Sequence, residues 1–187
     1  MMYRIITKLL FIFCLLNFSC KETSESETPE EEIKTKEITA EDSHITLEEG
    51  ARWDVLGSKI KGKILSSDTN GEYAVIITET PPNGGPPKHI HTKEDELFYV
   101  LQGTYEFVFG DELIIAEKGD MVHLPKGKAH TFKNIDSITG ITMNTITPGG
   151  FEGFFADIST LSKQNLLGRQ QIDSLANQYH IKFLKPE

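Results

Sequence analysis

The sequence that decides the fold is His89-Ile90-His91-Thr92-Lys93-Glu94-Asp95-Glu96, in which two histidines and a glutamate fall on neighbouring strand-like segments. Side chains two residues apart in a β-strand point to the same face, so His89 and His91 project together. Glu96 follows His91 at an odd offset, and the chain must therefore turn between them. Residues 92–95 are polar enough to make that turn, which leaves Glu96 at the start of the next strand.

A third histidine lies on a later strand-like segment, His130–Asn134. His130, Phe132 and Asn134 share one parity, whereas the polar residues Thr131 and Lys133 share the other. The polar pair is expected to face solvent, which turns His130 inward. Three imidazoles and one carboxylate can close around one divalent cation, and the predicted metal ligands are His89, His91, Glu96 and His130.

These four ligands limit the number of metals that fit the site but do not identify the metal. Three nitrogens and one oxygen suit iron, manganese, nickel, copper or zinc as a divalent transition metal, and the order of affinities does not choose among them. Glu96 has a second candidate role, because a carboxylate that leaves the metal could act as a catalytic general base on a bound hydroxyl. Phe98, Phe132 and His123 are candidate pocket residues, with ordinary packing as the alternative for each.

Short apolar runs separated by turn residues make the rest of the body an all-β pattern. Asn70-Gly71 is a strong turn signal, and the proline- and glycine-rich residues 81–87 must form a loop. The predicted strands, besides the one that carries His89 and His91, are Ile60–Ser66, Glu72–Thr80, Leu97–Gln102, Tyr105–Phe109, Leu113–Ala116, Met121–Leu124, His130–Asn134 and Ile138–Thr147.

The C-terminal part has a different period. Ile172, Leu175, Ala176 and Tyr179 fall at i, i+3, i+4 and i+7, which predicts an amphipathic helix over residues 169–180. A short strand is expected at Ile181–Phe183. We therefore expect a barrel over residues 46–158 and a helical extension over residues 159–187.

Two motifs carry a family resemblance. His-x-His, four residues, Glu, six residues, Gly is met by His89, His91, Glu96 and Gly103. Gly, five residues, Pro-x-Gly, two residues, His, three residues, Asn is met by Gly119, Pro125, Gly127, His130 and Asn134. Together they resemble the two signature motifs of the cupin superfamily. One position departs, since Asn83 stands where a glycine is expected six residues before His89, and this puts only the shape of the loop in doubt.

The resemblance extends over residues 50–185, and it is nearest to single-domain cupins described as quercetin-dioxygenase-like. It implies a cupin double-stranded β-helix, a jelly-roll barrel, with a short C-terminal α-helix. It also implies that His89, His91, Glu96 and His130 hold the metal inside the barrel. Asp95 is the rival carboxylate, but it breaks the spacing to Gly103.

The N-terminal residues predict export. Arg4 and Lys8 precede an apolar run that is too short to span a bilayer and has the length of a signal-peptide core. Ser19-Cys20 at its end resembles a bacterial lipoprotein signal, with residues 1–20 as signal peptide and Cys20 as the lipidated mature N-terminus. An ordinary cleaved signal and a retained anchor are the alternatives. Residues 21–45 are acidic and poor in apolar side chains, which predicts a disordered tether between membrane and domain.

Three functions are compatible with these residues. The first is a metal-dependent dioxygenase acting on a small enol- or catechol-like compound at the cell envelope. The second is a metal-dependent isomerase or lyase acting on a sugar or keto acid, and the third is a non-catalytic module that binds a small molecule. Fold alone does not choose among them.

The expected partners follow from charge and hydropathy. The net charge is −9, of which −8 lies in residues 21–49, and no basic stripe suggests a nucleic-acid partner. Leu97, Tyr99 and Leu101 give the strand after Glu96 a second apolar face, so this strand is expected to be covered on both sides. A homodimer is one way to cover that face, and the N-terminal strands or the C-terminal helix are the others.

Overall fold

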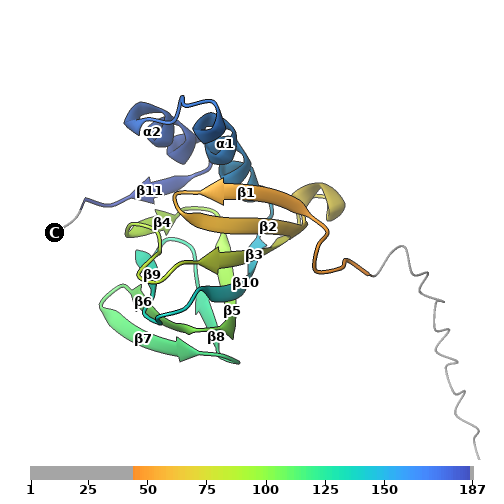
Figure 1. Ribbon diagram of the computed structural model, residues 1–187. Helices are drawn as coiled ribbons and strands as arrows, with labels where there is room; N and C mark the ends of the chain where they lie inside the picture. Colours follow the sequence, from red (N-terminus) through yellow and green to blue (C-terminus); the bar gives the residue numbers. More distant parts are fainter. Residues whose placement is uncertain (1–43, 186–187) are drawn as a thin grey trace, which may run out of the picture. The chain divides into compact units, whose positions relative to one another are not determined.

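The computed structural model describes residues 44–185. The predicted signal peptide, the lipidation site Cys20 and all but the last two residues of the predicted tether lie outside the described residues. Between residues 44 and 185 the chain forms two antiparallel β-sheets with two α-helices near its end, as Figure 1 shows. The predicted all-β fold class is confirmed.

The six-stranded sheet has the order β1-β2-β3-β10-β5-β8. Its strands are β1 (Ala51–Val55), β2 (Ser58–Ile64), β3 (Ala74–Thr80), β10 (Gly140–Thr147), β5 (Asp95–Gln102) and β8 (Met121–Leu124). The five-stranded sheet has the order β11-β4-β9-β6-β7. Its strands are β11 (Ile181–Phe183), β4 (His89–His91), β9 (His130–Asn134), β6 (Thr104–Phe109) and β7 (Glu112–Glu117). The strands that carry the predicted ligands therefore belong to both sheets.

Strict alternation of burial along the central strands sets which side chains face the barrel interior. In β3, and in β5 as far as Val100, every second residue is buried, as expected for strands with one face in the core. The outer face of β5 is not fully covered, because Leu101 is 36% exposed while Leu97 and Tyr99 are half-buried. The main strand contacts of the helices are to β1 and β11, and a homodimer that would cover this face of β5 stays a prediction.

Two loops have backbone geometry that fits their residues. Asn70 and Gly71 both have positive φ, 53° and 83°, as the Asn-Gly pair predicts. In the proline-rich loop, a Cβ added at Gly85 would lie only 1.9 Å from the carbonyl oxygen of Phe132. The loop that leads into β4 can therefore press against the backbone of β9 only because residue 85 has no side chain.

The described residues contain two helices where we expected one. α1 (Glu152–Lys163) follows β10, and α2 (Arg169–Gln178) agrees with the predicted helix over residues 169–180. Figure 1 shows them together at one end of the body, where α1 contacts β1 and α2 contacts β11. The expected boundary between residues 158 and 159 falls inside α1, so the chain is continuous helix at that point.

The interior contains two hydrophobic clusters. One lies between the helices and the N-terminal strands, and it includes Ile76, Phe151 and Ile158. The other is centred on Phe98, Tyr105 and Phe107 inside the barrel. The candidate site described below borders both clusters.

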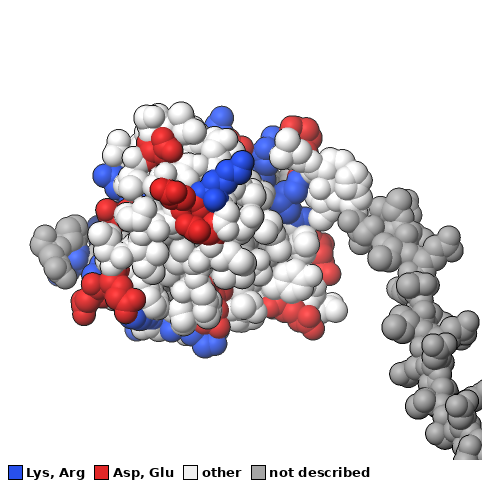
Figure 2. Space-filling model, turned by 90° about the horizontal axis from the view of Figure 1, so that it is seen from below, with Lys and Arg blue, Asp and Glu red and all other residues white. Residues whose placement is uncertain are grey.

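The surface and the helices of the described part have two further properties. On the face shown in Figure 2, acidic and basic side chains are interspersed and separated by broad uncharged areas. Neither helix between residues 44 and 185 has the length and hydropathy that a bilayer-spanning helix needs.

Candidate metal centre

The four predicted ligands converge inside the barrel. β4 supplies His89 and His91, β5 supplies Glu96, and β9 supplies His130, which lies directly opposite His89 in the ladder between β4 and β9. The candidate ligand atoms, one from each residue, all lie within 4.8 Å of one another. All four side chains are buried, with Glu96 the most accessible at 6%. The alternation of the strands brings together what the spacing predicted.

Each of the three imidazoles has its Nδ1 atom next to an oxygen atom. Nδ1 of His89 lies 2.8 Å from the carbonyl oxygen of Pro87, and Nδ1 of His130 lies 3.1 Å from that of Lys128. Nδ1 of His91 lies 3.5 Å from the Glu94 carboxylate. An oxygen beside Nδ1 favours the tautomer with the proton on Nδ1, which leaves the lone pair on Nε2 for a metal.

The distances from the Glu96 carboxylate to two of the imidazoles fit a single ion. Oε2 of Glu96 lies 3.2 Å from Nε2 of His130 and 3.5 Å from Nε2 of His91. Two ligands that are each about 2.1 Å from one cation lie roughly 3.0 to 3.4 Å apart when they are adjacent in octahedral or tetrahedral geometry. The donor types, their burial and their spacing all fit a divalent transition metal.

The electrostatics of the cluster favour an ionised Glu96 beside a neutral His89. Burial of Glu96 would raise its pKa, but His91, His130 and His89 together outweigh that effect and hold the pKa at about 2. Burial, together with the charges of His130 and His91, lowers the pKa of His89 to about 4. Near neutral pH Glu96 is therefore ionised and His89 is neutral, which are the forms that bind a cation.

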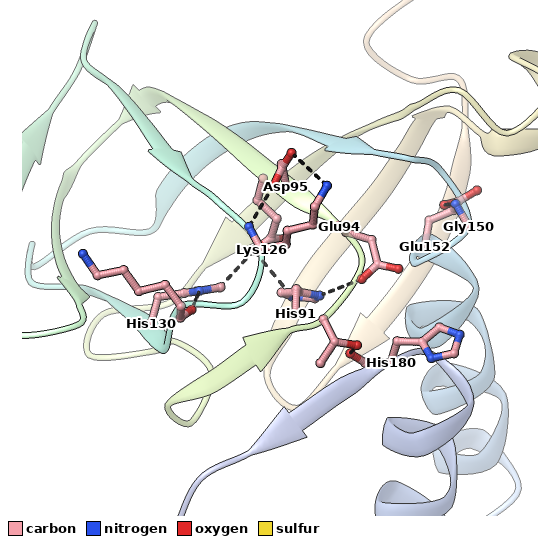
Figure 3. Close-up of polar contacts among 11 residues, drawn as sticks. His91, Glu94, Asp95, Lys126, His130, Gly150, Glu152 and His180 are labelled. Atoms are coloured by element: carbon pink, nitrogen blue, oxygen red, sulfur yellow. Dashed lines mark hydrogen bonds and ion pairs between the residues drawn. The ribbon is translucent and has the colours of Figure 1, made fainter.

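Glu94 is a site residue that sequence reasoning did not identify as one. It belongs to the predicted polar turn, yet it is only 6% exposed, and its carboxylate is directed at the His91 ring in Figure 3. Burial opposes the charged form of His91, but Glu96 and Glu94 outweigh burial and raise its pKa. The signal for Glu94 was weak, because an acidic residue in a turn is normally solvated.

The rival carboxylate Asp95 lies outside the cluster. One of its oxygens accepts a hydrogen bond from the backbone N–H of Lys126 at 2.8 Å, and the other lies 3.7 Å from Nζ of the same residue (Figure 3). The backbone N–H of Gly127 donates to the carbonyl oxygen of His91 at 2.7 Å. Asp95 therefore helps to hold the turn before β9 in contact with the strands that carry the candidate ligands.

A cavity of about 130 Å³ opens beside the cluster. Phe98 and Phe132, both predicted pocket residues, line it together with His89, His91 and Glu96. The remaining wall is mostly apolar and comes from β1, β2, α1, α2 and β11; its residues include Val55, Ile60, Phe151, Phe154, Phe155, Ile158, Ile172, Ile181 and Phe183.

The third predicted pocket residue lies elsewhere. His123 is exposed on the outer face of β8, opposite Leu97 of β5, and does not line the cavity. Its neighbours Val122 and Leu124 are the buried residues of that strand. Because successive side chains of a strand point to opposite faces, an inward Val122 and Leu124 turn His123 to solvent.

Comparisons with known proteins agree with this architecture. The family model described as "Cupin domain" matches residues 76–140, a range that contains all four candidate ligands. Quercetin 2,3-dioxygenase of Bacillus subtilis (strain 168) is 30% identical over 88 residues, which cover 47% of this chain and 26% of that protein. The rhicadhesin receptor of Pisum sativum is 32% identical over 108 residues, which cover 52% of this chain and 49% of that protein.

The curated relatives are thus matched over about a quarter and about half of their own length. Among solved structures, KdgF from Halomonas sp. superposes with a TM-score of 0.53 at 18% identity, covering 59% of this chain and 97% of that chain. At that identity the likeness shows the fold alone. The match over residues 76–140 and the two-sheet barrel together support the cupin superfamily, and the described body of this chain has the double-stranded β-helix fold with a candidate metal centre.

Proposed function

We propose that this protein binds a divalent transition metal through His89, His91, Glu96 and His130 and acts as a metal-dependent dioxygenase on a small enol- or catechol-like compound. One observation carries the proposal: the buried cluster of four ligand atoms lies at the wall of an apolar cavity. The partial likeness to a quercetin 2,3-dioxygenase supports the reaction class.

The residues around the cluster have different roles in this proposal. A bound divalent metal supplies a Lewis acid that can polarise an enol or catechol oxygen. The carbonyl oxygens of Pro87 and Lys128 orient His89 and His130 through Nδ1, and the Glu94 carboxylate lies 3.5 Å from Nδ1 of His91. The apolar wall excludes water from the reacting compound, which strengthens every electrostatic interaction in the cavity.

The charge state of Glu96 bears on its two candidate roles. A general base works best when its pKa lies near the working pH, because a much weaker base holds the proton poorly. A pKa of about 2 makes the Glu96 carboxylate a ready ligand and a poor proton acceptor. We therefore assign Glu96 primarily to holding the metal.

The location is part of the same proposal and rests on the sequence. Arg4, Lys8 and the apolar run that ends at Cys20 support export and attachment to a membrane by a lipid at the cell envelope. Intact-mass measurement of protein from the membrane fraction tests this. A mature chain that begins at Cys20 and carries the mass of a lipid is expected, and an unmodified Cys20 contradicts the anchor.

The function is tested by metal analysis followed by oxygen uptake. Full-length protein purified without chelators is expected to carry about one equivalent of transition metal, and catechol probes are expected to drive oxygen consumption with a redox-active metal. The variant His130→Ala should lose both properties. His123→Ala is the matched control, since it removes an exposed histidine and should leave both unchanged.

The other functions give different results in the same experiment. Turnover without oxygen, retained after substitution by zinc, would identify an isomerase or lyase. Tight binding of a probe without turnover under any metal would identify a binding module. A protein that takes up no metal would remove the proposal altogether.

A further inference from the structure

The cavity wall contains a small polar group besides the metal ligands. Among the residues that line the cavity, Ser58, Thr78 and Asn144 are polar and are not candidate ligands. Thr78 is 5% exposed and Asn144 is 4% exposed, so both are buried in the wall. The proposed metal binding does not use any of these side chains.

Asn144 lies on the inner face of the barrel close to Glu96. In the ladder between β10 and β5, Asn144 is opposite Phe98, and Ile146 is opposite Glu96. Asn144 is therefore the diagonal neighbour of Glu96 on the same face, a relation that places two Cα atoms roughly 7–8 Å apart. A compound held at the metal centre would lie within reach of the Asn144 amide.

One polar atom of the Asn144 side chain is not used in the hydrogen bonds of the barrel. Its Oδ1 atom is buried and has no hydrogen-bond partner among the described residues. Buried side-chain polar atoms are nearly always hydrogen-bonded, so an exception calls for an explanation such as an absent ligand.

Asn134, in the same barrel, is an asparagine whose side chain makes structural hydrogen bonds. It is fully buried, and its Nδ2 donates to the carbonyl oxygens of Thr80 and Ile138 at 2.9 and 2.8 Å. Its Oδ1 accepts the backbone N–H of Asp136 at 3.0 Å. Asn134 is satisfied by the protein itself, whereas Oδ1 of the similarly buried Asn144 has no such partner, and Asn144 is one of the residues that line the cavity.

The size and the apolar wall of the cavity limit what can fill it. An apolar protein cavity of about 150 Å³ accommodates benzene, and this cavity measures about 130 Å³. Phe151, which directly precedes α1, and Phe154 and Phe155 of α1 provide aromatic surface along one side. These features favour one planar ring over a fused multi-ring compound.

We propose that Asn144 is a positioning residue that hydrogen-bonds a hydroxyl group of a single-ring compound, on the part of the ring away from the metal centre. The inference rests on the proposed function, because it takes one edge of the ring to face His89, His91, Glu96 and His130. Beyond the proposed function, the inference specifies the size of the compound and requires that the ring carry a polar substituent.

Two probes that differ in one substituent test the inference. Both 1,2,4-trihydroxybenzene and 4-methylcatechol keep the adjacent hydroxyl pair, but only the first offers a third hydroxyl. Binding is measured calorimetrically and without oxygen on the full-length protein loaded with zinc, which prevents oxidation. Wild-type protein is expected to bind the trihydroxy probe about fivefold more tightly, which corresponds to one hydrogen bond.

The variant Asn144→Leu keeps a similar side-chain volume and removes the amide, so the ratio of the two affinities should fall to about one. Met143→Leu is the matched control, because Met143 is the preceding residue, lies on the outer face and is 36% exposed. This control should keep the wild-type ratio. Zinc content is measured for every protein and is expected to be unchanged.

The outcomes separate the inference from the proposed function. Zinc-loaded wild-type protein that binds both probes equally would overturn the role of Asn144 while leaving the metal centre intact, and this measurement does not depend on the folding of a variant. An unchanged ratio in Asn144→Leu at normal zinc content would overturn it as well. A wild-type protein that takes up no zinc would remove the proposed function, and the inference with it.

Discussion

The His91 ring lies between two carboxylates: its Nδ1 is 3.5 Å from Glu94, and its Nε2 is 3.5 Å from Glu96. Only Glu96 belongs to the set of candidate ligands. Glu94 instead lies behind the imidazole, where an acceptor for Nδ1–H fixes the orientation of the ring and raises its basicity. This arrangement makes the two glutamates distinguishable by experiment.

Substitution of Glu94 is expected to weaken metal binding without abolishing it. Glu94→Ala should lower the affinity for zinc by about 10- to 100-fold, the effect typical of losing a partner behind a ligating histidine. Glu94→Gln should have a smaller effect, because the amide oxygen can still accept the Nδ1 proton. Competition titration against a chelator of known affinity measures both.

The control for Glu94 is Glu79→Ala. Glu79 is half-buried on β3 and lies 3.5 Å from Nζ of Lys61, away from the metal centre. Equal loss of affinity in Glu79→Ala and Glu94→Ala would contradict a specific role for Glu94.

The neighbouring carboxylates Asp95 and Glu96 should differ in their effect on metal content. Glu96→Gln removes the only charged candidate ligand, and we expect it to lose most of the bound metal. Asp95→Asn should retain about one equivalent, because Asp95 contacts Lys126 and not the cluster. Elemental analysis of both purified variants decides between them, and the reverse pattern would make Asp95 the ligand.

The stability contributed by Glu152 should depend on pH. Burial would raise the pKa of Glu152, but hydrogen bonds from the backbone N–H groups of Ser66 and Gly150, each at 2.7 Å, outweigh it and lower the pKa below 4.5. A carboxyl group whose pKa is lower in the folded state contributes stability above its unfolded pKa and loses that contribution as the pH falls through its folded pKa.

The variant Glu152→Gln tests this dependence. Near neutral pH it should lower the free energy of unfolding by about 1–2 kcal/mol, since it replaces charge-assisted hydrogen bonds by weaker ones. The difference from wild type should shrink as the pH falls below about 4.5. Urea unfolding at a series of pH values measures it, with the exposed Glu112→Gln as control. A difference that stays constant down to the acid end of the series would be inconsistent with this account.

Phe151 should be important for stability as well as for the shape of the cavity. It is 3% exposed, and its ring centroid lies 4.3 Å from that of His91 in a T-shaped arrangement. Phe151→Ala should cost about 3–5 kcal/mol of stability, the usual result of emptying an aromatic site in a core. Leu113→Ala, at a position 63% exposed, should change stability by less than about 0.5 kcal/mol. Thermal or denaturant unfolding that shows similar small losses for both would refute the expectation.

The period of two along the strands was enough to predict which faces of the strands carry the candidate ligands. It places His89 and His91 on one face, and the turn at residues 92–95 returns the chain with Glu96 directed inward. The same rule would have excluded His123, because Val122 and Leu124 are the more apolar pair of their strand. Helix α1 also had a signal, since Phe151, Phe154, Phe155 and Ile158 follow the i, i+3, i+4, i+7 pattern.

Glu94 and Asn144 could not have been predicted from local sequence. A glutamate in a turn is usually solvated, and only the packing of the barrel buries Glu94 against an imidazole. Around Asn144 the local pattern is misleading: Ile141 and Met143 face outward, while the polar Thr142 and Asn144 face the interior. Burial of these side chains depends on which strands become neighbours, and that information is not local.

β11 completes the ladder of β4, with Ile181 opposite His91 and Phe183 opposite His89. During biosynthesis β4 emerges long before the segment that satisfies its free edge, so the strand with two of the candidate ligands cannot acquire its final neighbours until translation has passed Phe183. Cofactor loading is therefore expected to be a late event in maturation. A protease that clips the chain just before Ile181, or an affinity tag that disturbs this segment, would act directly on the two histidines.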